Sequence, residues 1–348
     1  MNPYILSTLL FGLGLGTTLT FASSHWLLAW MGLEMNTLAI LPLMAQHHHP
    51  RAVEATTKYF LTQATGAAML LFASTTNAWL TGQWDIQQMS HPLPITMITL
   101  ALALKMGLAP LHSWLPEVIQ GLDLTTGLIL STWQKLAPFV LLLQVQPTNT
   151  TLLVALGLAS TLVGGWGGLN QTQLRKILAY SSIAHLGWMT LVVQYSPSLA
   201  LLALLTYLLM TLSTFLVFKL NSSTTINALA TSWTKAPALT ALTPLLLLSL
   251  GGLPPLTGFM PKWLILQELA KQDLATIATF AALTALLSLY FYLRLSYAMA
   301  LTMSPNNTAG TTPWRFPSSQ ATLPLAVSTT ATLLLLPLAP AATALLTL

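Results

Sequence analysis

The sequence contains no cysteine and few charged residues. None of its 348 residues is cysteine, which excludes disulfides, thiolate zinc sites and iron–sulfur clusters held by this chain. Charged residues make up 5% of the chain and hydrophobic residues 54%, whereas about 25% of an ordinary soluble domain is charged. This composition excludes a soluble globular protein and indicates a membrane protein.

The apolar residues form long segments separated by short polar breaks. Eleven segments predict transmembrane helices, at about residues 3–22, 25–45, 57–80, 95–121, 123–144, 150–169, 175–195, 198–219, 236–271, 274–299 and 322–346. The first lacks the basic stretch of a signal peptide, so we expect it to remain as a helix. The fourth and ninth are long and contain prolines, which predicts one broken helix in each. The predicted fold is an all-α polytopic membrane protein, a single membrane domain over residues 1–348.

Basic residues are concentrated beside every second loop. The odd-numbered loops and their flanks hold Lys271, and the even-numbered ones hold eight residues: Arg51, Lys58, Arg175, Lys176, Lys219, Lys235, Arg294 and Arg315. Because loops rich in Lys and Arg stay on the matrix or cytoplasmic side, we expect the N-terminus on that side and the C-terminus opposite. These residues are scattered singly, so the net charge of +5 does not predict nucleic-acid binding.

Four charged residues lie deep within the predicted spans. They are Glu34 in the second, Lys105 in the fourth, Lys135 in the fifth and Lys262 in the ninth. A lysine at the centre of a membrane helix costs about 2.5–3.5 kcal/mol on insertion scales, so such residues usually face a bundle interior and mark an ion or proton path. These residues are the candidate functional site.

Residues 107–117 (GLAPLHSWLPE) and 252–262 (GLPPLTGFMPK) share one pattern. They lie five spans apart and therefore cross the membrane in opposite directions, which predicts inverted repeats over residues 3–144 and 150–300, followed by a loop and terminal helix in 301–348. Pro110 and Pro255 lack an N–H and crowd the carbonyl four residues earlier, so each should open its helix. The alternative is that these prolines only kink helices for packing.

The charges of the two repeats do not correspond. Lys262 aligns with Glu117, whereas Lys105 aligns with Leu250. This difference favours a one-way relay over two equivalent sites.

The two repeated segments and residues 173–187 (QLRKILAYSSIAHLG) resemble the antiporter-like proton-translocating subunits of respiratory complex I. The resemblance runs from the first predicted span to the tenth. Bacterial members of this family have fourteen helices, so the resemblance implies that the first three are missing here. It also implies that Glu34 and Lys105 form a carboxylate–lysine pair, that Lys135 is a central relay lysine and that Lys262 is the terminal proton-exchange residue. His112 and His185 are candidates for a relay histidine.

The resemblance implies a proton-translocating subunit of NADH:ubiquinone reductase in the mitochondrial inner membrane, with its N-terminus in the matrix and its C-terminus in the intermembrane space. NADH, FMN, iron–sulfur clusters and ubiquinone are then expected in partner subunits, and no cofactor is expected in this chain. The expected partners are other membrane-arm subunits, among them neighbouring antiporter-like subunits and accessory subunits, and phospholipids.

Several alternatives remain open at this point. The chain is alternatively a stand-alone cation/proton antiporter of the related multisubunit type, or a lipid-facing scaffold. Glu34 and Lys105 are alternatively a structural ion pair, and Lys135 a lysine that extends to the interface. His112 either relays protons or binds a carbonyl freed by the helix break. The run His47, His48 and His49 abuts Pro50 and predicts a solvated loop rather than a metal site.

Overall fold

The computed structural model describes residues 2–46, 49–145, 149–234, 236–301 and 322–347. Within these ranges the chain is helical and has no β-strand, apart from two isolated bridges between loops. The predicted all-α class is therefore confirmed. His47, His48, Lys235, Arg315 and most of the loop predicted after residue 301 lie outside the described residues.

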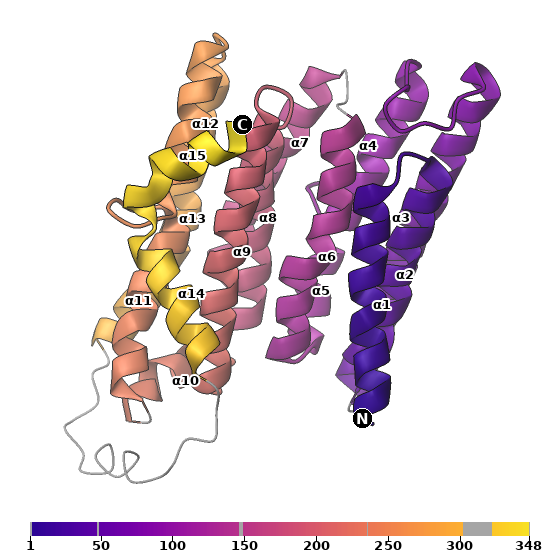
Figure 1. The fold of residues 1–348 in the computed structure, drawn as a ribbon. Coiled ribbons are helices and arrows are strands. Elements are labelled where there is room, and N and C mark those ends of the chain that lie inside the picture. The colour runs from indigo at the N-terminus through magenta and orange to yellow at the C-terminus, as the bar shows by residue number, and fades with distance from the viewer. Residues whose placement is uncertain (1, 47–48, 146–148, 235, 302–321, 348) are drawn as a thin grey trace. The chain divides into compact units, whose positions relative to one another are not determined.

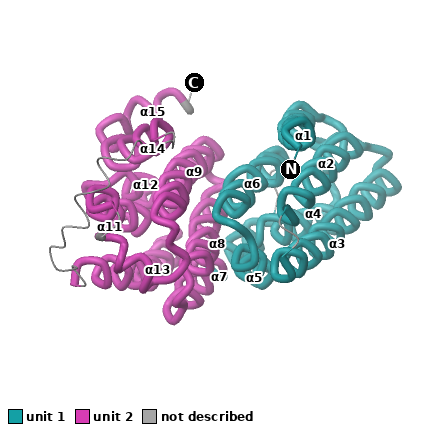
Figure 2. Tube along the Cα trace, turned by 90° about the horizontal axis from the view of Figure 1, so that it is seen from below, with its two compact units in different colours: residues 1–159 teal, residues 160–348 magenta. Residues whose placement is uncertain are grey.

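The chain forms two compact units, residues 1–159 and 160–348 (Figure 2). The helices of the first unit are α1 (Pro3–Ala22), α2 (Trp26–Met44), α3 (Pro50–Thr81), α4 (Pro92–Met106), α5 (Trp114–Gly121), α6 (Leu124–Val145) and the first part of α7 (Thr150–Gly168) (Figure 1). The second unit contains the rest of α7, then α8 (Leu174–Val192), α9 (Pro197–Leu220), α10 (Ile226–Ala230), a 3₁₀ turn (Thr231–Thr234), α11 (Pro237–Gly251), α12 (Phe259–Lys271), α13 (Ala275–Leu301), α14 (Leu323–Leu334), a second 3₁₀ turn (Leu336–Leu338) and α15 (Ala339–Thr347).

The helices follow the predicted apolar segments. The first predicted span coincides with α1, whereas α3 begins at Pro50 rather than at residue 57. Proline suits the first position of a helix because its missing N–H is not needed there, and the ring of His49 accepts a bond from the N–H of Arg51 at 3.3 Å. This local chemistry extends α3 beyond its apolar part.

Six of the described helices are long and apolar enough to cross a membrane, or seven if α14 and α15 together form one span. The shorter apolar helices α4 and α11 have 15 residues each, about 22 Å at 1.5 Å per residue, against a hydrocarbon core of about 30 Å. Each is followed by a break and a second short helix. The predicted fourth and ninth segments are therefore both broken.

The terminal segment differs from its prediction. Residues 322–346 were expected to form one helix, but α14 and α15 are bent by 67° at the 3₁₀ turn between them. Pro337 lies in that turn and Pro340 follows in the first turn of α15. Two prolines three residues apart remove two backbone donors, which accounts for the break.

In the described part of each unit, one isolated bridge joins two loops. In the first, His25 before α2 pairs with Asp85 after α3, and in the second Gln173 before α8 pairs with Thr225 after α9. In both units, the residue before one helix thus pairs with a residue in the loop that follows the next helix in the chain.

Candidate functional site

The first broken helix ends at a glycine. Gly107 has φ +81°, and its N–H donates to the carbonyl of Leu104 at 3.2 Å, while the N–H of Leu108 donates to Ala103 at 2.9 Å. This bonding is the Schellman motif, in which a left-handed glycine closes a helix and satisfies its last carbonyls.

The second broken helix ends in the same way. Gly252 has φ +80°, its N–H donates to Ser249 at 2.9 Å and the N–H of Leu253 donates to Leu248 at 3.2 Å. The sequence prediction placed both openings at Pro110 and Pro255, which lie exposed within the breaks. Both prolines thus lie within the breaks, but α4 and α11 have already ended at the glycine that begins each repeated pattern.

Carbonyl groups freed by the first break are bonded by side chains. The indole N–H of Trp114, the first residue of α5, donates to Leu104 at 3.1 Å. The amide of Gln63 on α3 donates to the carbonyl of Lys105 at 3.4 Å. The end of α4 is therefore held from both α5 and α3.

Lys105 lies in the last turn of α4 and is buried. Its Nζ has no hydrogen-bond partner among the described residues. Glu34 on α2 is half-buried and close enough to attract Lys105 electrostatically, but no ion pair within 4.0 Å joins them. Glu34 instead accepts a bond from the hydroxyl of Thr37 at 3.1 Å. The structure thus brings the two residues together without direct contact.

Lys135 on α6 is also buried, and it lines the same cavity as Lys105. The space for a water centre in this cavity is about 20 Å³, and about 10–15 Å³ is enough for one water molecule. The cavity is also lined by Tyr59, Gln63 and Gln134. The volume and these polar groups are compatible with one water molecule in the cavity that the two lysines line.

Gln134 connects the lining of this cavity to two other helices. Its amide donates to the carbonyl of Asn36 on α2 at 3.3 Å, and its side-chain oxygen lies 3.5 Å from the hydroxyl of Tyr59 on α3. Gln134 and Tyr59 were not predicted as part of the site. The signal in the sequence is weak, because a neutral amide or phenol in an apolar segment costs much less than a charge.

Lys262 lies in the second unit, in the first turn of α12. Its Nζ donates to the carbonyl of Gly251, the last residue of α11, at 2.8 Å. The C-terminal end of a helix carries partial negative charge, so this position favours an ammonium group. Lys262 borders a mainly apolar pocket of about 340 Å³, lined among others by Trp188, Phe259 and Trp263.

The two candidate histidines lie in different units. His112 is in the first break, with its Nδ1 3.3 Å from the carbonyl oxygen of Pro110. His185 on α8 is buried, and its ring packs against Tyr207 with centroids 5.4 Å apart. The first unit thus contains Glu34, Lys105, Lys135 and His112, and the second contains His185 and Lys262.

Comparison with known proteins identifies the family. Residues 23–288 match the family model described as NADH:quinone oxidoreductase/Mrp antiporter, TM, and residues 289–343 match that for the NADH dehydrogenase subunit 2 C-terminus. The chain is 76% identical over 340 residues to NADH-ubiquinone oxidoreductase chain 2 of Tetraodon nigroviridis, covering 98% of both chains. It is 73% identical to that of Gadus morhua over the full length of both. The chain belongs to the NADH-ubiquinone oxidoreductase chain 2 family.

Two solved structures contain chains with a fold similar to that of this family member. The chain is similar to one in respiratory complex I from Thermus thermophilus, with a TM-score of 0.85 and 30% identity over 100% of this chain and 80% of that one. It is also similar to a chain of the Mrp complex from Dietzia sp., with a TM-score of 0.78 and 16% identity over 97% of this chain and 75% of that one. At that identity the second similarity shows the fold alone.

Proposed function

We propose that this chain is a core membrane subunit of respiratory complex I in the mitochondrial inner membrane. In this proposal it translocates protons, while NADH oxidation and ubiquinone reduction take place in other subunits. The observation that carries the proposal is identity of 73% over the full length of a chain named NADH-ubiquinone oxidoreductase chain 2. NADH, FMN, iron–sulfur clusters and ubiquinone then belong to partner subunits.

Glu34, Lys105 and Lys135 form the first part of the proposed relay. A low-dielectric interior destabilises an ammonium group, and a nearby carboxylate stabilises it. Both influences act on Lys105, which is buried and within electrostatic range of Glu34. Movement of Glu34 toward or away from Lys105 would therefore load or unload its proton, and the cavity that both lysines line is the proposed path of that proton to Lys135.

Lys262 is the proposed exchange site in the second unit. Among the residues that the structure describes, no carboxylate is within 4.0 Å of the Nζ of this lysine, and its ammonium is bonded to the end of α11. A helix end gives a fixed partial charge, whereas a carboxylate gives a full charge that can move. Lys262 is thus suited to a different step from that of Lys105.

The proposed topology has eleven spans with inverted repeats over residues 3–144 and 150–300. Matching glycine caps in the two breaks and matching bridges between loops support this arrangement. The distribution of Lys and Arg supports an N-terminus in the matrix and a C-terminus in the intermembrane space. Membrane-arm subunits, including antiporter-like and accessory subunits, and phospholipids are the proposed partners.

Replacement of Lys105 by methionine in the assembled enzyme tests the relay. Methionine fills a similar volume but carries no proton, so we expect the number of protons pumped per NADH oxidised to fall while quinone reduction continues. The matched control is Lys271→Met, because Lys271 is an exposed lysine paired with Glu268. Assembly and pumping that both survive in Lys105→Met would show that Lys105 is not in the relay.

A stand-alone cation/proton antiporter is the alternative function. The similarity to the Mrp complex, at 16% identity, supports the shared fold and not this activity. Purification discriminates between the two, because a complex I subunit is recovered with an arm that oxidises NADH. A separately stable exchanger containing this chain would contradict the proposal.

A further inference from the structure

One face of α3 follows the broken helix α4–α5 across its break. Four residues of α3 with helical spacing make the contacts: Ala55, Lys58, Tyr59 and Gln63. Ala55 lies close to Gly121, and a Cβ added to this glycine would be 2.8 Å from the Cβ of Ala55. Lys58 forms an ion pair with Glu117. Tyr59 packs against Trp114 with ring centroids 5.8 Å apart, and the amide of Gln63 donates to the carbonyl of Lys105. The face therefore extends from the end of α5 to the charged end of α4.

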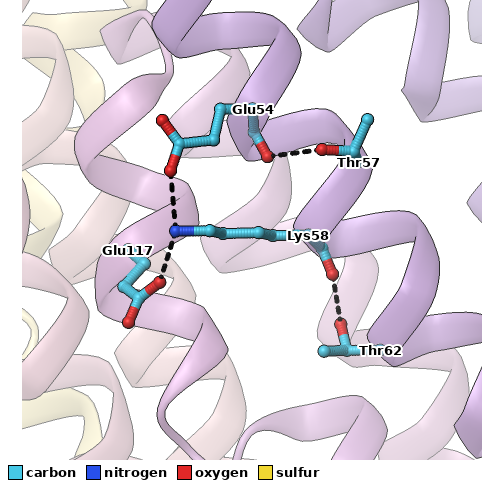
Figure 3. A network of polar contacts seen from close by, with 5 residues as sticks. All are labelled: Glu54, Thr57, Lys58, Thr62 and Glu117. Atoms are coloured by element: carbon cyan, nitrogen blue, oxygen red, sulfur yellow. Dashed lines mark hydrogen bonds and ion pairs between the residues drawn. The ribbon is translucent and has the colours of Figure 1, made fainter.

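Lys58 has two carboxylate partners at the same distance (Figure 3). Its Nζ lies 2.8 Å from Glu54, one turn earlier on α3, and 2.8 Å from Glu117 on α5. The first pair lies within a single helix. The second joins α3 to the short helix that follows the break.

The position of α5 determines a contact beside Lys105. This helix has eight residues and begins with Trp114, whose indole bonds to Leu104 at the end of α4. Glu117 is one turn further along α5. A shift of α5 along α3 would therefore move the indole away from the carbonyl next to Lys105.

The matched position in the second break anchors its helix differently. Lys262, which aligns with Glu117, folds back onto the end of α11 and bonds to Gly251. In both units the residue at this position thus links the second half of the broken helix to another helix. In the first unit that other helix is α3.

We propose that the ion pair between Lys58 and Glu117 is a positioning contact that holds α5 against α3 and thereby holds Trp114 on the end of α4 beside Lys105. This inference rests on the proposed relay function of Lys105. It assigns Lys58 and Glu117 no direct part in carrying protons.

Glu117→Gln and Glu54→Gln form a matched pair of variants for the test. Each removes one carboxylate from Lys58, but only Glu117→Gln removes the link to α5. In the assembled enzyme we expect Glu117→Gln to lower the number of protons pumped per NADH measurably and by no more than about five-fold, the largest change in an equilibrium that an exposed pair supports, with quinone reduction retained. Glu54→Gln should leave the ratio unchanged, and exchange of the charges in Lys58→Glu with Glu117→Lys should restore it.

Equal ratios in Glu117→Gln and Glu54→Gln would overturn the proposal, as would failure of the exchanged pair to restore pumping. If Glu117→Gln does not assemble, Glu117→Asp keeps the charge and decides. Normal assembly and pumping in Glu117→Asp support the ion pair. Failure of both Glu117→Gln and Glu117→Asp to assemble overturns the proposal, because the loss of assembly then follows from altered packing and not from the lost charge. Lys105→Met separates this result from failure of the relay itself, since full pumping in that variant contradicts the proposed function directly.

Discussion

Lys105 and Lys262 flank corresponding helix breaks but have different neighbours. Lys105 is on the first half of its broken helix, near the carboxylate of Glu34 and beside a small cavity with both polar and apolar lining residues. Lys262 is on the second half, bonded to a helix end and beside an apolar pocket. Burial disfavours the charged form of both lysines, and a different group offsets that cost at each one, the carboxylate of Glu34 near Lys105 and the end of α11 at Lys262.

Substitution of Gly252 tests the position of Lys262. Alanine at φ +80° costs about 1–2 kcal/mol, and its Cβ would lie 2.8 Å from Cδ and 3.0 Å from Nζ of Lys262. Gly107→Ala has the same backbone cost at φ +81°, but its nearest neighbours are at 3.5 Å. We expect similar losses in thermal stability of the purified enzyme, with a lower proton-to-NADH ratio in Gly252→Ala alone. Equal ratios would mean that the position of Lys262 is not critical.

Glu54 provides a pH-dependent prediction outside the membrane span. The ammonium of Lys58, which is bonded to Glu54, holds the pKa of this carboxyl below its ordinary value of about 4.5. A lowered pKa in the folded protein contributes stability above the unfolded pKa, and this contribution is lost as pH falls through the folded value. The thermal midpoint should therefore fall more between pH 6 and pH 4 in the wild type than in Glu54→Gln. An equal fall in both would contradict the pairing.

The charged residues of the site could be found in the sequence, and the neutral ones could not. Glu34, Lys105, Lys135 and Lys262 stand out because a charge in an apolar span is costly. Tyr59, Gln63 and Gln134 come together only when α3, α4 and α6 pack around one cavity. That packing depends on helix rotation, which hydropathy does not specify.

At the scale of the elements, the breaks were predicted correctly but for an incomplete reason. Proline was expected to open both helices, whereas the glycine at the start of each pattern ends them through backbone bonds. The same pattern G-L-x-P carries both signals, and the left-handed glycine precedes the proline by three residues. The bend between α14 and α15 was missed because the apolar run continues through Pro337 and Pro340.

Trp114→Phe tests the bond across the first break. Phenylalanine occupies the matched position in the second break, as Phe259, but has no N–H to donate to Leu104. The carbonyl of Leu104 keeps the N–H of Gly107, so we expect a loss of about 1 kcal/mol, the low end of the range for a lost buried bond. Thermal inactivation of the purified enzyme measures this loss.

Trp79→Phe is the control for this substitution, because Trp79 is 86% exposed. It should leave the inactivation temperature unchanged. A fall in Trp79→Phe as large as that in Trp114→Phe would attribute the effect to the loss of indole in general.

At the scale of the whole molecule, hydropathy predicted the order of the helices and their approximate ends. The segments at 3–22 and 150–169 agree with α1 and α7 to within one residue. The division into units at residue 159, within α7, has no counterpart in composition. It depends on which helices pack together, and apolar surfaces of similar composition do not encode that choice.

The glycine caps of α4 and α11 have a consequence for how the two halves differ. The C-terminal ends of both helices are closed by main-chain hydrogen bonds. These bonds do not involve the side chain ten residues after each glycine, which is Glu117 in one half and Lys262 in the other. The same backbone geometry therefore accommodates an acid or a base at that position. The side chain at that position has a different partner in each half, Lys58 on α3 for Glu117 and the carbonyl of Gly251 for Lys262, while the glycine caps stay the same.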